Sequence, residues 1–254
     1  MSATPPSRRP SPRRNRTRSR PTGPSTVPSS PSAPLTDSAA LPDDATLTEA
    51  GLAPAGTGRV LVIACGALAR EIVALRDLNG WTRMDLACLP AILHNHPERI
   101  PQAVEDAVAA HAGRYARIFV AYADCGTGGR LAETCARLGV EMIEGPHCYA
   151  FFEGNAAFAA RGEADMTAFY LTDFLARQFD AFVWRPLGLD RHPELLPMYF
   201  GHYARLVYLA QTDDPALDAA AREAATRLGL RYERRHTGYG DLAPALERAA
   251  HAVD

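Results

Sequence analysis

Residues 117–139 have the sequence RIFVAYADCGTGGRLAETCARLG, which decides the class of fold. The first seven residues are rich in β-branched and aromatic side chains, as is typical of a short buried strand. The glycine-rich segment DCGTGG follows at 124–129, and residues 130–138 carry apolar side chains at helical spacing. Gly139 suits the left-handed position that commonly ends a helix. The stretch therefore predicts a strand, a tight turn and a helix in succession.

The same alternation extends to both sides of this stretch. Further strands are predicted at 59–64, 84–89, 140–143, 204–210 and 230–235. Helices are predicted at 67–80, 99–111, 149–158, 172–184 and 215–228, with a short connector or helix at 193–202. Strands that alternate with helices indicate parallel pairing, because a parallel connection must cross over the sheet. We expect an α/β fold with one open, mostly parallel sheet and helices on both faces.

Residues 1–56 differ in composition from the rest of the chain. They are rich in Pro, Ser, Thr, Ala and Arg, and they hold seven Arg against four acidic residues. A segment with no hydrophobic period cannot bury enough apolar surface to offset the entropy lost on ordering. We expect a disordered Arg/Pro/Ser-rich leader at 1–56, followed by one domain at 57–254.

The charge and hydropathy of the predicted domain argue against two classes of function. Once the leader is set aside, residues 57–254 hold 20 Arg and 25 acidic residues, a net charge of −5. An acidic domain argues against nucleic-acid binding, which usually needs a basic face. No run of 18 apolar residues is present, so no helix is predicted to span a membrane.

The odd number of cysteines and the start of the chain bear on whether the thiols are oxidised or reduced. The chain has five, an odd number, and the Arg-rich start is not followed by the apolar segment of a secretory signal. We expect reduced thiols in the cytoplasm, where metal binding or catalysis is the usual reason to cluster them. Cys88 lies inside a predicted strand and Cys135 inside a predicted helix, so both are expected to be buried as small hydrophobic residues.

The other three cysteines occupy equivalent places. Cys65, Cys125 and Cys148 each follow a predicted strand directly or within a few residues. Ligands of open α/β sheets bind outside the carboxyl ends of the strands, so these thiols are expected to meet at one edge. His94 and His96 follow the second strand and reach the same edge.

Three thiolates and an imidazole suit a tetrahedral zinc ion, and thiolates also hold iron–sulfur clusters. The candidate metal ligands are Cys65, His94, Cys125 and Cys148. Two alternatives remain open at this point: Cys125 as a nucleophile in a metal-free site, and structural thiols packed under tight turns.

The glycines of the DCGTGG segment have two interpretations. Gly126, Gly128 and Gly129 let backbone N–H groups approach an anion at the start of the following helix, which makes them candidate cofactor-binding residues for a phosphate or carboxylate. The plainer interpretation is a tight turn that displays Cys125. The segment does not match a P-loop, because the chain has no Lys.

Several of these motifs together resemble a known family. The motifs are ACGA at 64–67, LHNHPE at 93–98, CGTGG at 125–129, HCYAFF at 147–152 and YLT at 170–172. Over about residues 59–245 they are similar to the family catalogued as DUF1638, a domain of unknown function. The most specific positions of the resemblance are Cys65, His94, Cys125-Gly126 and Cys148.

The resemblance implies a role in corrinoid-dependent methyl transfer, since members of the family are associated with corrinoid proteins, methyltransferases and reactivation proteins, and some with methionine synthesis. A zinc site would activate a substrate thiol toward methyl-cobalt. An iron–sulfur cluster would instead deliver an electron to oxidised cobalt.

Two other functions remain as alternatives. One is a metal-free cysteine-dependent enzyme, with Cys125 activated at a helix N-terminus and a histidine as its base. The other is a non-catalytic partner or chaperone of a corrinoid protein, in which the cysteines are structural.

Overall fold

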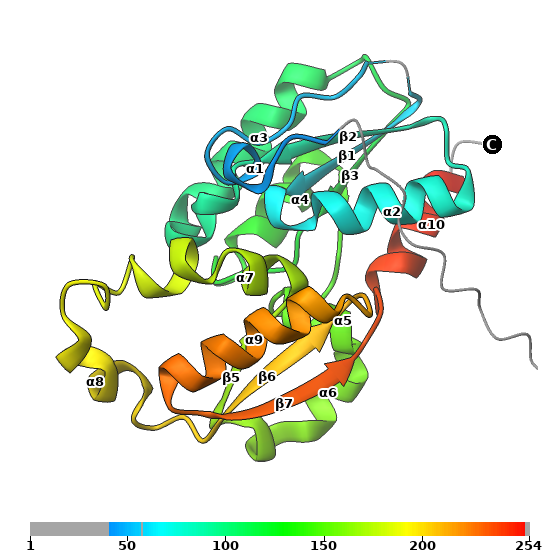
Figure 1. Ribbon diagram of the computed structural model, residues 1–254. Coiled ribbons are helices and arrows are strands. Elements are labelled where there is room, and N and C mark those ends of the chain that lie inside the picture. Colours follow the sequence, from blue (N-terminus) through cyan, green and yellow to red (C-terminus); the bar gives the residue numbers. More distant parts are fainter. Residues whose placement is uncertain (1–40, 57, 252–254) are drawn as a thin grey trace, which may run out of the picture. The chain divides into compact units, whose positions relative to one another are not determined.

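The computed structural model describes residues 41–56 and 58–251. Within these ranges the chain forms two parallel sheets with helices packed against them (Figure 1). The predicted α/β class is confirmed, but the strands are divided between a four-stranded and a three-stranded sheet instead of forming one sheet. No helix within the described ranges is long and apolar enough to cross a membrane.

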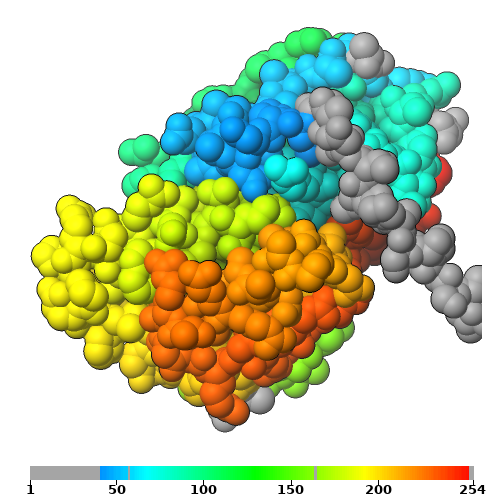
Figure 2. Space-filling view, in the orientation of Figure 1, coloured from blue at the N-terminus to red at the C-terminus, as the bar shows by residue number. Residues whose placement is uncertain are grey.

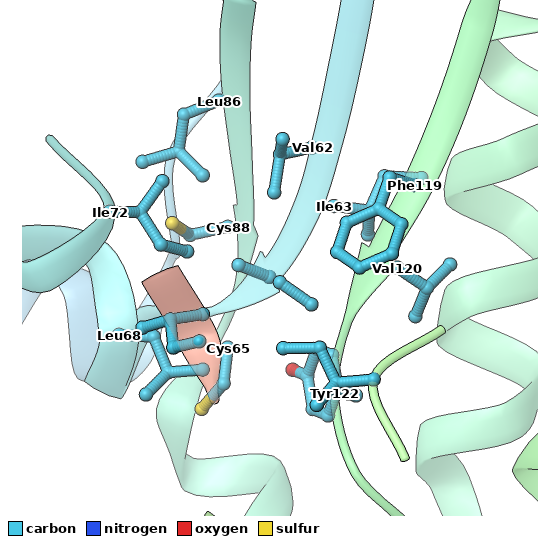
Figure 3. Packing of buried hydrophobic residues seen from close by; sticks show 14 of the residues in the cluster. Val62, Ile63, Cys65, Leu68, Ile72, Leu86, Cys88, Phe119, Val120 and Tyr122 are labelled. Atoms are coloured by element: carbon cyan, nitrogen blue, oxygen red, sulfur yellow. The ribbon is translucent and has the colours of Figure 1, made fainter. Parts of the chain in front are cut away.

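The first sheet has β1 at its centre. In spatial order its strands are β2 (Met84–Leu89), β1 (Val60–Cys65), β3 (Arg117–Ala121) and β4 (Glu141–Met142). All pairings are parallel, and Val62 lies beside Leu86 of β2 and Phe119 of β3. Every residue of β1 is buried, as Figure 3 illustrates for Val62 and Ile63. The end of β1 therefore lies at the carboxyl edge of the sheet, between two neighbouring strands.

Helices cover both faces of this sheet. They are α2 (Ala69–Asn79), α3 (Ile100–His111), α4 (Arg130–Leu138) and α10 (Leu242–His251). Helices α3 and α4 contact each other behind the strands in Figure 1, and α2 and α10 lie on the opposite side. Gly139 ends α4 in the left-handed conformation, with φ 66°, as the sequence predicts. Helix α10 was not predicted from the sequence, in which the last predicted helix ends at residue 228.

The second sheet consists of β5 (Ala168–Leu171), β6 (Arg205–Ala210) and β7 (Arg231–His236), which pair in parallel in that order. Its helices are α5 (Cys148–Glu153), α6 (Asn155–Arg161), α7 (Asp173–Arg177), α8 (Leu196–Phe200) and α9 (Pro215–Leu228). The sheet is separate because β4 pairs over only two residues, and the strand that follows it in the chain, β5, pairs with β6 instead.

Part of the expected leader forms a helix. Helix α1 (Asp44–Glu49) lies within the expected leader, and Asp43 caps it by accepting a hydrogen bond from the N–H of Thr46 at 2.8 Å. Leu47 is 0% exposed and packs in the core of the first sheet. The expectation of disorder at 1–56 is therefore wrong for residues 44–49. Residues 1–40 of the predicted leader lie outside the described residues.

Charged side chains connect α1 to α2 and α7. Asp44 accepts a hydrogen bond from Nε of Arg70 at 2.9 Å and another from Nε of Arg177 at 2.8 Å. Figure 2 shows the blue residues around α1 against the yellow-green segment around α7. Glu71 lies nearby, is 4% exposed, and its Oε2 has no hydrogen-bond partner among the described residues. Burial raises the pKa of Glu71 to about 7, and the neighbouring Arg177 offsets only part of that effect.

Candidate functional site

The candidate site is built at the carboxyl edge of the first sheet. Cys65 is the last residue of β1, and its side chain is 2% exposed. Its sulfur accepts a hydrogen bond from the N–H of Ala67 at 3.4 Å, which caps the 3₁₀ turn that precedes α2. The central strand thus presents a thiol at its end, where the sheet rule predicts ligand binding.

Cys125 lies in the loop after β3 and has a left-handed backbone, with φ 48°. Among the described residues it is the one non-glycine residue with a positive φ, a strained conformation that is enriched at functional sites. The N–H of Asp124 donates to the carbonyl of Gly145 at 3.0 Å, and that of Cys125 donates to the carbonyl of Pro146 at 2.9 Å. These two bonds join the loop after β3 to the loop after β4.

Cys148 follows the second of these loops as the first residue of α5. His147 precedes it as the N-cap, and its Nδ1 accepts a hydrogen bond from the N–H of Ala150 at 3.4 Å. His147 therefore stabilises the start of α5. The bonds between the two loops place Cys148 close to Cys125, and the charge of Cys125 contributes to raising the pKa of Cys148.

His94, not His96, faces the thiols. His94 lies in the 3₁₀ turn Ala91–Asn95 after β2, and its Nδ1 is 3.4 Å from the sulfur of Cys65. The side chain of His96 is exposed, with its Nδ1 3.7 Å from Glu98. The sequence left the choice between the two histidines open, and the turn settles which ring points inward.

One small cavity is lined by Cys65, His94, Cys125 and Cys148. Its volume is about 20 Å³, enough for one water molecule or one ion. The other lining residues present almost no polar surface, apart from the hydroxyl of Tyr122. Larger surface cavities of about 390, 240 and 540 Å³ contain no cysteine. The structure thus brings together all four predicted metal ligands.

The donor set fits a single zinc ion, but the side chains do not form a finished metal centre. Across residues 41–56 and 58–251, no group of three or more His, Cys, Asp or Glu side chains is arranged so that it could hold a metal ion. Three sulfurs and an imidazole around a one-ion cavity are nevertheless what a tetrahedral zinc site requires. Ligation would need these side chains to close on the cavity.

The electrostatics of the cavity favour the neutral forms of Cys65 and Cys148 in the absence of a cation. Burial raises the pKa of the Cys65 thiol to about 12, and the hydrogen bond from the N–H of Ala67 and the nearby hydroxyl of Tyr122 lower it only in part. Burial also raises the pKa of Cys148 well above its usual value. A bound cation reverses this balance, because a coordinated thiol is deprotonated.

The pKa of His94 is shifted upward, whereas burial usually lowers the pKa of a histidine. Burial alone would lower the pKa of His94, but a hydrogen bond with Cys125 and the charge of that thiolate raise it more. The pKa of His94 therefore lies above its usual value.

The glycine turn does not offer a free anion site. The carboxylate of Asp124 accepts hydrogen bonds from the N–H groups of Gly128 at 3.1 Å and Gly129 at 2.7 Å, and from the hydroxyl of Thr127 at 2.7 Å. Gly126 also bonds to this carboxylate, and these bonds lower the pKa of Asp124. The chain's own carboxylate thus occupies the N–H groups of Gly128 and Gly129, and binding of a cofactor's phosphate or carboxylate by Gly126, Gly128 and Gly129 stays a prediction.

Two further expectations about cysteines have clear outcomes. Cys88 and Cys135 are 5% and 2% exposed, so both are buried as predicted. Cys125, in contrast, does not lie at a helix N-terminus, because α4 begins only at Arg130 with Gly129 as its N-cap. The helix dipole that the nucleophile hypothesis invoked is therefore absent at Cys125, and Cys148 is the thiol that starts a helix.

Sequence reasoning missed Tyr122 as a residue of the site. It follows the last residue of β3, is 1% exposed, and lines the same cavity as the thiols. The available signal was its position, since it lies three residues before Cys125 at the same strand end.

Comparison with known families matches residues 88–246 to the family described as "Protein of unknown function (DUF1638)". His94, Cys125 and Cys148 lie inside the matched segment, and Cys65 lies before it. The resemblance drawn from the motifs is thus confirmed for this segment. No curated protein and no solved structure gives a significant match to the chain.

Proposed function

This chain belongs to the DUF1638 family, and we propose that it is a cytoplasmic zinc-binding protein that supports corrinoid-dependent methyl transfer. Cys65, Cys125 and Cys148 would hold the ion, with His94 as the fourth ligand or as the hydrogen-bond partner of a ligand. The observation that carries the proposal is the single cavity that these four side chains line.

The size of the cavity favours zinc over an iron–sulfur cluster. A volume of about 20 Å³ suits one ion, whereas a cluster brings several iron and sulfide atoms. A cluster that reactivates oxidised cobalt by electron transfer remains the alternative, and it would require a wider opening of the loops after β3 and β4.

Zinc bound here would act as a Lewis acid that lowers the pKa of a coordinated thiol at neutral pH. The protein's own part is to position the ligands. Cys65 is buried at the end of the central strand and would hold the inner side of the ion. His94, Cys125 and Cys148 are half-buried and would face an arriving substrate thiol. The expected partner is a corrinoid protein or a methyltransferase, and the resemblance to the family supports this part.

Metal content tests the proposal directly. The protein is purified anaerobically, and zinc, iron and sulfide are measured in the wild type and in Cys65→Ser, Cys125→Ser and Cys148→Ser. We expect about one zinc per chain, and a loss of zinc in each variant. Cys135→Ser is the matched control, because Cys135 is equally buried but lies on α4 outside the cavity. Full zinc occupancy in Cys125→Ser would contradict the proposal, and iron with sulfide would favour the cluster.

A second assay tests the methyl-transfer role. A methylated corrinoid protein and a thiol acceptor are incubated with the wild type or with Cys125→Ser, and the demethylated cobalt is followed by its visible spectrum. We expect acceleration by the wild type alone. An equal rate of demethylation with the wild type and with Cys125→Ser would refute the role in methyl transfer, and the proposal would be reduced to metal binding.

One observation favours a second candidate, a metal-free cysteine-dependent enzyme. Cys125 has a strained backbone and interacts with His94, whose pKa it raises. These are the features of a nucleophile paired with a base. Alkylation by iodoacetamide near neutral pH distinguishes the candidates: fast labelling of Cys125 that is lost in His94→Ala supports the enzyme, and slow uniform labelling excludes it.

A further inference from the structure

Tyr122 is a cavity residue that the metal-binding proposal does not use. Its ring stacks on the imidazole of His94, with the ring centroids 6.3 Å apart and the planes inclined by 18°. Figure 3 shows its hydroxyl directed toward Cys65. The presence of this hydroxyl lowers the pKa of the Cys65 thiol, as expected of a donor beside a sulfur.

The hydroxyl of Tyr122 has no hydrogen-bond partner of good geometry among the described residues. Buried polar groups are nearly always hydrogen-bonded, so an unpaired hydroxyl in a 1% exposed residue needs an explanation. A neutral thiol is a weak acceptor, whereas a thiolate accepts a short, charge-assisted hydrogen bond.

We propose that Tyr122 is a positioning residue, whose hydroxyl donates a hydrogen bond to the sulfur of Cys65 and so orients that sulfur in the cavity. The effect on zinc binding rests on the proposed function, whereas the contact between Tyr122 and Cys65 does not require the metal. Together with the N–H of Ala67, at 3.4 Å from the same sulfur, Tyr122 gives Cys65 two donors.

The two donors set Cys65 apart from the other thiolates of the site. A thiolate that accepts two hydrogen bonds shares its charge with the donors and is a weaker nucleophile. Cys65 is thereby kept as a permanent ligand, and the reactive sulfur is left to Cys125, Cys148 or the substrate. The stack on His94 also holds the imidazole beside Cys65, so one side chain orients two of the four ligands.

The test uses Tyr122→Phe, which removes the hydroxyl but keeps the ring and its stack on His94. Zinc affinity is measured by competition with a chromogenic chelator. We expect affinity to fall about 10- to 100-fold, the usual effect of losing an outer hydrogen bond to a ligand, with unchanged stoichiometry. Tyr208→Phe is the control: Tyr208 is 0% exposed, and its hydroxyl donates to Asp173 in the second sheet. Its zinc affinity should match the wild type.

A second readout does not depend on zinc. The infrared S–H stretching band of Cys65 is identified in the metal-free protein as the band that Cys65→Ser removes, and it should shift in Tyr122→Phe but not in Tyr208→Phe. Equal zinc affinity in Tyr122→Phe and the wild type would overturn the inference while the proposed function stands. A wild type that binds no zinc but shows the band shift would refute the zinc site and support the Tyr122–Cys65 contact. No zinc binding together with no shift would refute both.

Discussion

Replacement of Glu71 by Gln should remove a pH dependence from the stability of the fold. Glu71 is 4% exposed, its Oε2 is unpaired among the described residues, and Asp173 adds a repulsive charge. Arg177 and Arg70 favour its ionised form but do not compensate for burial, so its pKa rises from 4.5 to about 7. Each tenfold change in proton affinity corresponds to about 1.4 kcal/mol, so the ionised carboxylate costs the folded state about 3 kcal/mol.

The sign of the effect follows from linkage. The folded state holds the proton of Glu71 more tightly than the unfolded state, so Glu71 carries no penalty below pH 4.5, and the penalty grows up to about pH 7. The free energy of unfolding of the wild type should fall by about 3 kcal/mol over this range, and that of Glu71→Gln should not.

Urea denaturation between about pH 5 and pH 8 measures the difference. His94, whose pKa is also raised, loses stability in the same direction as the pH rises, but it contributes equally to both proteins. The difference between the two curves therefore isolates Glu71. Parallel curves would show that Glu71 is hydrated or paired in solution, and the electrostatic reasoning would be refuted.

Three further predictions concern the frame around the site. Leu47→Ala should lower the free energy of unfolding by about 2–5 kcal/mol, because Leu47 is fully buried, whereas Leu78→Ala, at an 80% exposed position, should change it by less than about 0.5 kcal/mol; equal effects in urea denaturation would mean that α1 is not part of the core. Gly51→Ala should lower the melting temperature far more than Gly80→Ala, because both glycines have a positive φ but only a Cβ at Gly51 would lie 2.0 Å from a carbonyl oxygen of β2. An equal fall in melting temperature for the two variants would contradict this close contact. Asp124→Ala should cost about 1–3 kcal/mol through the donors it leaves unpaired, and it should also reduce zinc content; normal zinc content would show that the turn does not position Cys125.

Local patterns predicted the individual elements well. The boundaries of β2 at 84–89, α4 at 130–138 and α9 at 215–228 agree with the structure residue by residue. Each of these elements has a clear hydrophobic period and a clear stop, which are properties of the local sequence.

What the sequence did not predict depends on long-range contacts. The short strand β5 lies in an aromatic region that carries no alternation, so its pairing with β6 and the second sheet were missed. Helix α1 was missed because its burial depends on a single leucine within a polar segment.

At the candidate site, too, some features were predictable from the sequence and others depend on the folded structure. The rule that parallel strands present their carboxyl ends at one edge was sufficient to bring Cys65, His94, Cys125 and Cys148 together. The direction of individual side chains was not accessible, because it depends on the 3₁₀ turn at Ala91–Asn95 and on the glycine turn. For that reason the occupation of the glycine N–H groups by Asp124 could not be predicted, and His94 was distinguished from His96 only by the resemblance to the family.

The backbone bonds from Asp124 and Cys125 to the loop before α5 have a mechanical consequence. A pull on the Cys125 sulfur that closes the cavity is transmitted to the start of α5 through these bonds. The next residue after Cys148 is Tyr149, whose ring stacks on Tyr170 of β5 with the centroids 5.4 Å apart. These contacts link the cysteines of the cavity to β5 by a short chain of bonds and packed rings. Binding of an ion in the cavity should therefore change the packing of the Tyr170 ring before it changes the rest of the second sheet.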